Sequence, residues 1–244
     1  MRMVIELAGI PMEVECRHEA NRTFMKDYLS SRAPQISIIP TEKDFDDTAE
    51  RLRSRNVQDG CPDIRYSDVF VENCTLHRLI VQQLVPCGVL LMHGSALCMD
   101  GRAYIFSAPS GPGKSTHARL WREMFGERVW MINDDKPLLR FRENGVDVWG
   151  SPWDGKHRLS RNASAPLQAV VFLRRAAENR IRPMTAVEAF PFLLSQTYSS
   201  EDMQTMEKIA GMQQILLRQI RFYRLECNME PEAAMTAWKG VRGE

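Results

Sequence analysis

Apolar and polar residues alternate in short runs near the start of the chain. Residues 3–15 carry this alternation on both sides of Gly9-Ile10-Pro11, which predicts two short strands joined by a turn. Residues 35–39 predict a third strand, and residues 21–31 between them predict a helix. Residues 1–60 are therefore expected to form a small α+β region.

A second helix and a boundary end this region. Thr41 is followed three residues later by Asp44, a pairing typical of a helix N-terminus, and the helix is expected to run towards Arg55. Residues 56–62 contain an Asp-Gly pair and a proline, which predict a loop or a domain boundary. We therefore expect residues 61–244 to form the main domain.

The longer second part of the chain mixes helical and strand periodicity. Its predicted elements are a helix from residue 73, strands over 89–92, 96–98 and 103–106, a helix from 115, a strand over 129–132, a hairpin around residues 144–145, a strand over 167–173, a helix over 203–216, a strand over 220–225 and a helix over 230–238. Asp100-Gly101 and Asn144-Gly145 are dipeptides typical of tight hairpins. This pattern predicts an α/β fold with a mixed sheet that contains antiparallel hairpins.

Composition narrows the classes of partner. The chain is 44% hydrophobic, enough to bury a substantial core, and its formal net charge of +1 favours no nucleic-acid partner. No stretch approaches the roughly 20 apolar residues of a membrane span, so no membrane partner is expected. The six cysteines form no CxxC pair and no signal peptide is visible, which favours reduced thiols in a cytoplasmic protein.

The segment over residues 108–115, Ala-Pro-Ser-Gly-Pro-Gly-Lys-Ser, carries the clearest chemistry. It fits the relaxed phosphate-binding pattern of Ala or Gly, four variable residues, Gly-Lys and then Ser or Thr, and it stands between a predicted strand and a predicted helix. Glycines let backbone N–H groups converge on phosphate at a helix N-terminus, while Lys114 adds a mobile positive charge and Ser115 can ligate Mg²⁺. The sequence therefore predicts binding of ATP with Mg²⁺. The expected nucleotide-binding residues are Ser110, Gly111, Gly113, Lys114, Ser115 and Thr116.

An acidic pair, Asp134-Asp135, follows the predicted strand over residues 129–132 and comes roughly twenty residues after Lys114. One carboxylate at this place can hold Mg²⁺ together with Ser115. The other can accept the proton of an attacking hydroxyl. A solvated turn is the alternative interpretation.

Two histidines lie close to these motifs in the sequence. His93 follows the predicted strand over residues 89–92, which we expect to pair with the strand that leads into the phosphate-binding loop, so that His93 comes near the phosphates. There it could pair with Asp135 and orient it, or carry a proton itself; a structural role is the alternative. His117, in the first turn of the predicted helix, is interpreted as a surface or packing residue.

Residues 151–158, Ser-Pro-Trp-Asp-Gly-Lys-His-Arg, predict a polar loop after a hairpin. Lys156, His157 and Arg158 are candidates for binding phosphate. Trp153 could stack on a base or pack inside. An ordinary surface loop is equally compatible with these residues.

The order of His93-Gly94, a hairpin, residues 110–115 and Asp134-Asp135 resembles the catalytic domain of the HPr kinase/phosphorylase family. It also resembles the nucleotide-binding part of ATP-dependent phosphoenolpyruvate carboxykinase, a related P-loop fold. The resemblance covers residues 90–135 and extends weakly to Arg158. It implies a P-loop catalytic domain, and the small α+β appendage expected over residues 1–60 from the sequence pattern would precede it.

What this resemblance implies is an ATP- and Mg²⁺-dependent transfer of the γ-phosphoryl group to a serine hydroxyl. By the same analogy Lys114 and Ser115 serve the phosphates and the metal, Asp134 lies on the metal side, Asp135 is the base and His93 is its partner. Which aspartate takes which role is left open. The acceptor is also open among a protein, a peptide and a small molecule such as free serine, and so is assembly into a homo-oligomer.

Two other functions stay open. A nucleotide-binding regulator would bind ATP and change shape or oligomerise without any transfer, and Asp135 would then be dispensable. A phosphoenolpyruvate carboxykinase-like enzyme would act on oxaloacetate, although the sequence shows no second phosphate- or carboxylate-binding block.

Overall fold

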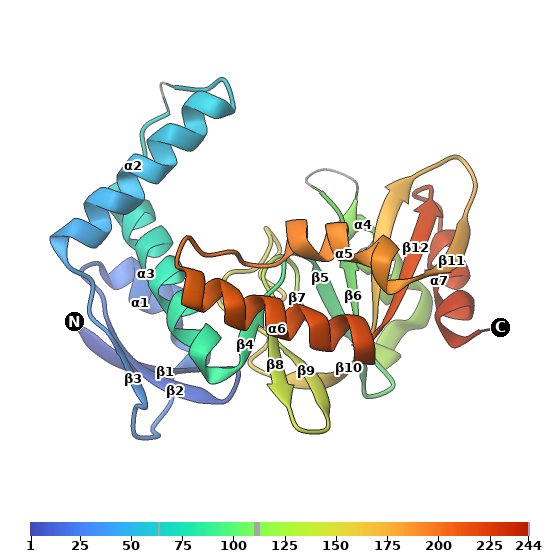
Figure 1. The fold of residues 1–244 in the computed structure, drawn as a ribbon, viewed down its shortest axis with the longest axis horizontal. Helices are drawn as coiled ribbons and strands as arrows, with labels where there is room; N and C mark the ends of the chain where they lie inside the picture. Colours follow the sequence, from blue (N-terminus) through green and yellow to red (C-terminus); the bar gives the residue numbers. More distant parts are fainter. Residues whose placement is uncertain (63, 110–112, 244) are drawn as a thin grey trace. The chain divides into compact units, whose positions relative to one another are not determined.

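A computed structural model describes residues 1–62, 64–109 and 113–243, and the chain divides into two compact units (Figure 1). The first unit spans Met1–Leu84 and the second Val85–Glu244, so the division comes later than the boundary expected at residue 60. Helix α3, Asp68–Leu84, accounts for the difference. It packs on the two helices before it, and this contact keeps it within the first unit.

The first unit combines a small sheet with helices. Strand β1, Arg2–Leu7, pairs antiparallel with β2, Ile10–Glu15, and β3, Ile36–Ile38, pairs in parallel with β2. The helices are α1, Glu19–Phe24, α2, Glu42–Gln58, and α3. The first unit thus combines a three-stranded sheet with helices.

Helix ends in this unit both follow and depart from the sequence pattern. Thr41 and Asp44 cap α2 reciprocally, each side chain bonding the other residue's backbone N–H. The helix expected over residues 21–31 is interrupted, since α1 stops and a 3-10 turn follows it at Lys26–Tyr28. Helix α2 continues into the predicted loop as far as Gln58, and Asn56 near its end accepts a 2.7 Å hydrogen bond from the side chain of Tyr66.

The second unit alternates strands and helices. In chain order its elements are β4 Val89–Leu91, β5 Ser95–Met99, β6 Arg102–Ser107, α4 Lys114–Phe125, β7 Val129–Asn133, β8 Leu138–Arg142, β9 Gly145–Trp149, β10 Ser164–Arg175, β11 Arg180–Met184, α5 Ala186–Gln196, α6 Met203–Gln219, β12 Arg221–Cys227 and α7 Glu232–Arg242. The strands form a mixed sheet in the order β4-β8-β9-β10-β6-β5-β7, with β12 beside β10 and β11 beside β12. Both predicted hairpins are present, between β5 and β6 and between β8 and β9. The α/β prediction with antiparallel hairpins is confirmed.

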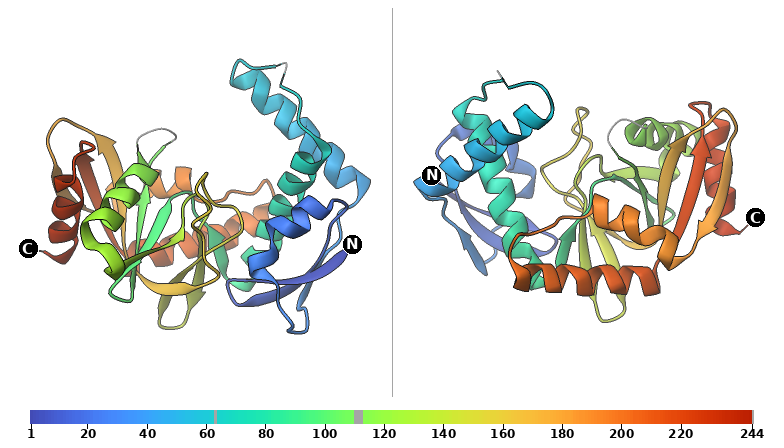
Figure 2. Two further views of the ribbon diagram at one scale, coloured as in Figure 1. Left: turned by 180° about the vertical axis from the view of Figure 1, so that it is seen from behind. Right: turned by 45° about the horizontal axis from the view of Figure 1, so that its top comes forward.

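Helices cover both faces of the part of the sheet around β6. Helices α5 and α6 lie on one face and α4 and α7 on the other, as opposite views show (Figures 1 and 2). Ala103 and Ile105 of β6 belong to the core under α5 and α6, whereas Tyr104 and Phe106 belong to the core under α4 and α7. Burial on both faces fixes β6 inside the sheet and therefore fixes where its following loop begins.

Strand direction brings separate motifs to one end of this sheet. Strands β6, β7, β10 and β12 run the same way and β5 runs against them. Ser95, at the start of β5, therefore pairs opposite Phe106, near the end of β6, and Ala96 pairs opposite Asn133, at the end of β7. The pairing expected for the strand before His93 is wrong, because β4 pairs with β8 and not with β6. His93 reaches this end of the sheet because it directly precedes β5.

Candidate functional site

The segment after β6 leads into α4 in the order that a phosphate-binding loop requires. Gly113 precedes the helix with a φ of 93°, a left-handed conformation that glycine adopts without steric cost. Helix α4 begins at Lys114, one residue before the expected start. The predicted nucleotide-binding residues Ser110 and Gly111 lie outside the described residues.

Lys114 lies near the acidic pair. Its Nζ donates a 3.3 Å hydrogen bond to the backbone carbonyl of Ala108. Burial lowers the pKa of Lys114, and the charges of Asp135 and Asp134 oppose that shift. The charges of the two carboxylates therefore act on the ammonium group of Lys114.

Asn133, at the end of β7, fixes the turn that presents the acidic pair. Its Oδ1 accepts hydrogen bonds from the backbone N–H groups of Asp135 at 2.9 Å and Lys136 at 2.6 Å. Its Nδ2 donates to the carbonyl of Ser151 at 3.0 Å. Because Asn133 is fully buried, this turn is held by the core and by the loop that starts at Ser151.

The side chain of Asp134 is buried. It is 7% exposed, and its Oδ1 accepts a 2.6 Å hydrogen bond from the hydroxyl of Ser95. Gly155 packs against the other oxygen so closely that a Cβ there would lie 2.8 Å from Oδ2. The Asp134 carboxylate is thus held in one place, as a metal ligand must be.

Asp135 lies between a histidine and a lysine. Its Oδ1 is 3.3 Å from Nε2 of His93, and its Oδ2 accepts a 2.6 Å hydrogen bond from Nζ of Lys136. Burial alone would raise the pKa of Asp135, but the hydrogen bonds from His93 and Lys136 outweigh it and lower the pKa to about 2. Asp135 is therefore ionised across the physiological pH range. The predicted pair of His93 and Asp135 is formed.

A cavity of about 120 Å³ lies beside the first turns of α4. Its polar lining comes from Ser115, Thr116, Arg119, Arg122, Asp134 and His157. It is large enough for several waters, or for a metal ion with some of its ligands. Ser115 and Asp134, the two expected metal ligands, face the same space.

These residues fit Mg²⁺ by their chemistry. Among the described residues no group of three or more His, Cys, Asp and Glu could hold a metal by itself. Mg²⁺ in nucleotide sites needs only one or two carboxylates, because phosphates and water supply the remaining oxygens. One immobilised carboxylate and one helix hydroxyl on a common cavity meet this requirement.

Some side chains of the loop over residues 151–158 pack inside the protein, and one lines the cavity beside α4. Trp153 is buried, which favours its packing interpretation over stacking on a base, and Lys156 is exposed. Arg158 forms an ion pair with Asp154 at 3.3 Å. His157 lines the cavity beside α4. Of the three basic candidates, His157 is the one that the structure places on this cavity.

His117 is a core residue. It is 2% exposed, stands edge-on to Phe106, and its Nε2 accepts a 3.1 Å hydrogen bond from the indole N–H of Trp121. Burial lowers the pKa of His117 to about 3, so the ring is neutral in the folded protein. Its predicted packing role holds.

Sequence reasoning missed four residues that support the site, namely Ser95, Asn133, Lys136 and Gln196. Gln196, at the end of α5, contacts His93 with Oε1 at 3.1 Å from Nδ1. Asn133 and Lys136 flank the acidic pair, so their position in the sequence offered a signal. Ser95 and Gln196 offered none, because only folding brings them to Asp134 and His93.

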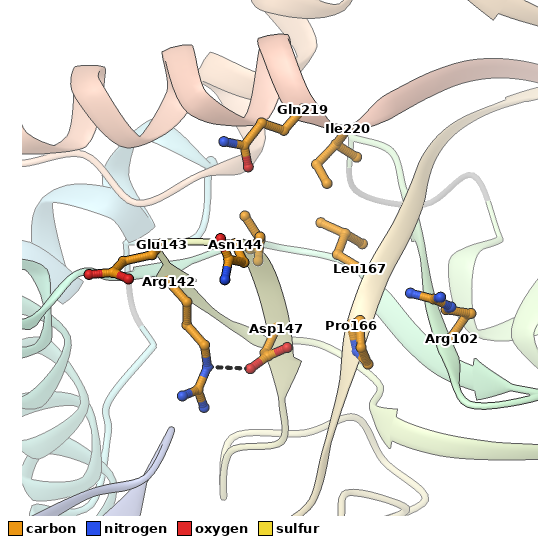
Figure 3. A pocket seen from close by; sticks show the side chains of 11 residues that line it. Arg102, Arg142, Glu143, Asn144, Asp147, Pro166, Leu167, Gln219 and Ile220 are labelled. Carbon is orange, nitrogen blue, oxygen red and sulfur yellow. Dashed lines mark hydrogen bonds and ion pairs between the residues drawn. The ribbon is translucent and has the colours of Figure 1, made fainter.

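A larger cavity, of about 620 Å³, lies at the opposite end of the same sheet. Figure 3 shows it between the β8–β9 hairpin and the end of α6, with Arg102 at the start of β6. Arg142 and Asp147 of the hairpin form an ion pair on its wall. None of the predicted site residues lines this cavity.

Two further features concern the chain as a whole. Among the described residues, no helix combines the length and the apolar character needed to cross a lipid bilayer. The six cysteines, all within the described part, are unbridged.

No protein-family model matches this chain, and no curated protein matches it. Among solved structures, it is similar to the Hpr(Ser) kinase/phosphatase from Coxiella burnetii, with 10% sequence identity and a TM-score of 0.37. The similarity covers 63% of this chain and 94% of that chain. A likeness this distant leaves the function to be argued from the residues themselves.

Proposed function

We propose that this protein is an ATP- and Mg²⁺-dependent kinase that transfers the γ-phosphoryl group to a serine hydroxyl. One observation supports it above the others. The phosphate-binding loop sequence ends with the helix residues Lys114 and Ser115, and the contact between Asp135 and His93 lies at the same end of the sheet, where the charge of Asp135 acts on Lys114. Transfer needs a phosphate cradle and a proton acceptor side by side.

The start of α4 would bind the phosphates. Backbone N–H groups at a helix N-terminus attract anions, and Lys114 adds a mobile charge for the outer phosphates. Ser115 and Asp134 would hold Mg²⁺, which supplies positive charge to phosphate oxygens when it is bound. Thr116 lies in the same turn and lines the same cavity.

Asp135 would act as the base. In the transfer, the serine O–H bond breaks, its oxygen forms a bond to the γ-phosphorus, the bond to ADP breaks and the proton passes to Asp135. A carboxylate that is already ionised at neutral pH is ready to accept that proton. His93 would orient it through the 3.3 Å contact.

A nucleotide-binding regulator without transfer is the second candidate, and Lys136 favours it. Its ammonium group holds Oδ2 of Asp135 at 2.6 Å, while His93 holds Oδ1. With both oxygens engaged, Asp135 accepts a serine proton only if one of these contacts gives way. A protein that merely binds ATP would keep both.

Labelled ATP separates the candidates. The protein is incubated with γ-labelled ATP and Mg²⁺ and with free serine, serine-containing peptides or small proteins as acceptors, and binding is measured in parallel by calorimetry. A labelled phosphoserine product that disappears without Mg²⁺ supports the kinase. Tight ATP binding with no product across all acceptor classes supports the regulator, and absence of ATP binding refutes both.

The same assay tests the carboxykinase-like alternative. Oxaloacetate replaces the serine acceptors, and the products are analysed for phosphoenolpyruvate. We expect none, because the sequence shows no second phosphate- or carboxylate-binding block. Formation of phosphoenolpyruvate would indicate a different reaction at this site.

A further inference from the structure

Gln196, the last residue of α5, contacts His93 through both backbone and side chain. Its carbonyl accepts a 2.7 Å hydrogen bond from the backbone N–H of His93, and its Oε1 lies 3.1 Å from Nδ1 of the ring. Gln196 is only 8% exposed. The buried side chain of Gln196 thus packs against the edge of the His93 ring that faces away from Asp135.

The carboxamide of Gln196 has its orientation set without His93. Its Nε2 donates to the backbone carbonyl of Ser195 at 3.2 Å and lies 3.3 Å from the Ser195 hydroxyl. A carbonyl oxygen can only accept, so the amide nitrogen must face it and Oε1 must face His93. Because Oε1 also only accepts, Nδ1 of His93 must carry a hydrogen.

The other ring nitrogen faces the carboxylate. Nε2 of His93 lies 3.3 Å from Oδ1 of Asp135. When Nδ1 is held on Gln196, a rotated ring that turns carbon towards Asp135 would lose both contacts. The contact with Gln196 therefore determines which atom of His93 meets Asp135.

The backbone around this contact is held from both sides. Met92, just before His93, forms a β-bridge with Thr197, just after Gln196. The hydroxyl of Thr197 in turn accepts a 2.7 Å hydrogen bond from the buried Gln213 of α6. The end of α5 and the segment that carries His93 are thus bonded to each other through backbone and side-chain contacts.

We propose that Gln196 is a positioning residue, which fixes the His93 ring with a hydrogen on Nδ1 and so directs Nε2 at Asp135. The ring orientation follows from these contacts alone. Its consequence for phosphoryl transfer rests on the proposed function.

Nitrogen NMR of the histidine rings tests the proposal on the whole protein. The spectrum of ¹⁵N-labelled protein at neutral pH reports for each ring nitrogen whether it carries hydrogen, and the signal lost in His93→Gln identifies His93. We expect hydrogen on Nδ1 in the wild type. Gln196→Met, which removes the acceptor at similar length, should lose that preference, whereas Gln196→Glu, which keeps an acceptor oxygen, should retain it.

Asn56→Leu is the control, because it removes a buried amide whose partners are Ile64 and Tyr66 in the first unit and not the segment that carries His93. It should leave the His93 signal as in the wild type. A wild-type ring with a bare Nδ1, or a Gln196→Met ring identical to the wild type, overturns the proposal. Should Gln196→Met fail to fold, Gln196→Asn withdraws the oxygen by one methylene and is judged by the same signal.

ATP binding and transfer, measured on the same variants, separate this proposal from the proposed function. If the protein is a kinase, Gln196→Met should lower kcat about tenfold or more while KM for ATP stays unchanged, since a misplaced histidine affects transfer and not nucleotide binding. An Nδ1 hydrogen with no ATP binding would overturn the function and leave the positioning role in place. A kinase whose kcat is insensitive to Gln196→Met would overturn the link between them.

Discussion

The two ends of the second unit's sheet differ in a way that cavity size does not reveal. The end near Arg102 has a cavity of about 620 Å³, and the end near Ser115 has one of about 120 Å³. The smaller cavity contains a buried carboxylate, Asp134, and lies beside the start of α4. In the larger one, the charged residues Arg142 and Asp147 neutralise one another.

The two ends of the sheet therefore differ in the polar groups that they hold, and cavity volume does not reveal this difference. Strands β6 and β7 both finish at the smaller cavity, so the segments after them converge there, as is usual at the carboxyl ends of strands in α/β sheets. At the opposite end, the β5–β6 and β8–β9 connections are tight hairpins.

The largest expected effect is on transfer. Asp135→Asn keeps the size of the side chain and removes the proton acceptor, so kcat should fall about 1000-fold while ATP affinity is kept. The matched control is Asp147→Asn at the larger cavity, where turnover should be unchanged. Rates of phosphoserine formation measure both variants, and full turnover in Asp135→Asn would exclude it as the base.

The next effect is on nucleotide binding. Lys114→Ala removes the charge at the start of α4 and should weaken ATP binding about 100-fold. Arg102→Ala removes a charge from the larger cavity and should leave the affinity as it is. Calorimetric titration with ATP and Mg²⁺ measures the affinity of both variants. A greater loss of ATP affinity in Arg102→Ala than in Lys114→Ala would place the nucleotide at the end of the sheet with the larger cavity.

A smaller effect concerns stability at the end that carries α4. His117 has a folded-state pKa of about 3 against an ordinary value of 6.5, because it is buried. Above pH 6.5 neither the folded nor the unfolded chain protonates it; as the pH falls from 6.5 to about 3, only the unfolded chain does, so stability declines over that window. His117→Gln, which keeps an acceptor for Trp121, should remove about 2 kcal/mol of the loss between pH 6.5 and pH 5.

Urea unfolding at a series of pH values measures this difference. Gln214→Asn, which changes an exposed amide on α6 that does not titrate, is the control and should leave the pH dependence as in the wild type. Identical slopes for wild type and His117→Gln would mean that the unfolded and folded chains protonate His117 alike.

The smallest effect concerns the metal side of the site. Gly155→Ala places a Cβ 2.8 Å from Oδ2 of Asp134, so the carboxylate must shift. The Mg²⁺ concentration for half-maximal ATP binding should rise severalfold, a cost of about 1 kcal/mol. Gly211→Ala, on α6 with open space around it, is the matched control and should bind Mg²⁺ as the wild type does. An unchanged Mg²⁺ dependence in Gly155→Ala would argue that Asp134 is not a ligand.

Features encoded over a few residues were predictable. Thr41 and Asp44 form the expected cap, and Asp100-Gly101 and Asn144-Gly145 form the expected hairpins, because caps and tight turns depend on neighbouring residues alone. Strand β6 and helix α4, on either side of the phosphate-binding pattern, belong to the same class. These local signals were sufficient to propose nucleotide chemistry.

Features that depend on distant contacts were missed. No pattern indicated β11 or α5, since β11 is largely exposed and α5 contains Pro191 in its interior. The expected partner of β4 was wrong, because sequence does not say which strands become neighbours. Helix α3 likewise belongs to the first unit because it packs on the helices before it, and the sequence of the loop that precedes α3 does not indicate this packing.

By itself, the sequence determined the phosphate-binding pattern, the acidic pair and the α/β class, since each is written in residues close together along the chain. Only the tertiary structure decided that His93 meets Asp135, that Ser95 holds Asp134, and that Gln196 stands behind His93. The physical reason is the antiparallel β5, which starts where β6 and β7 end. Strand order and direction, set by burial on both faces of the sheet, brought these residues together.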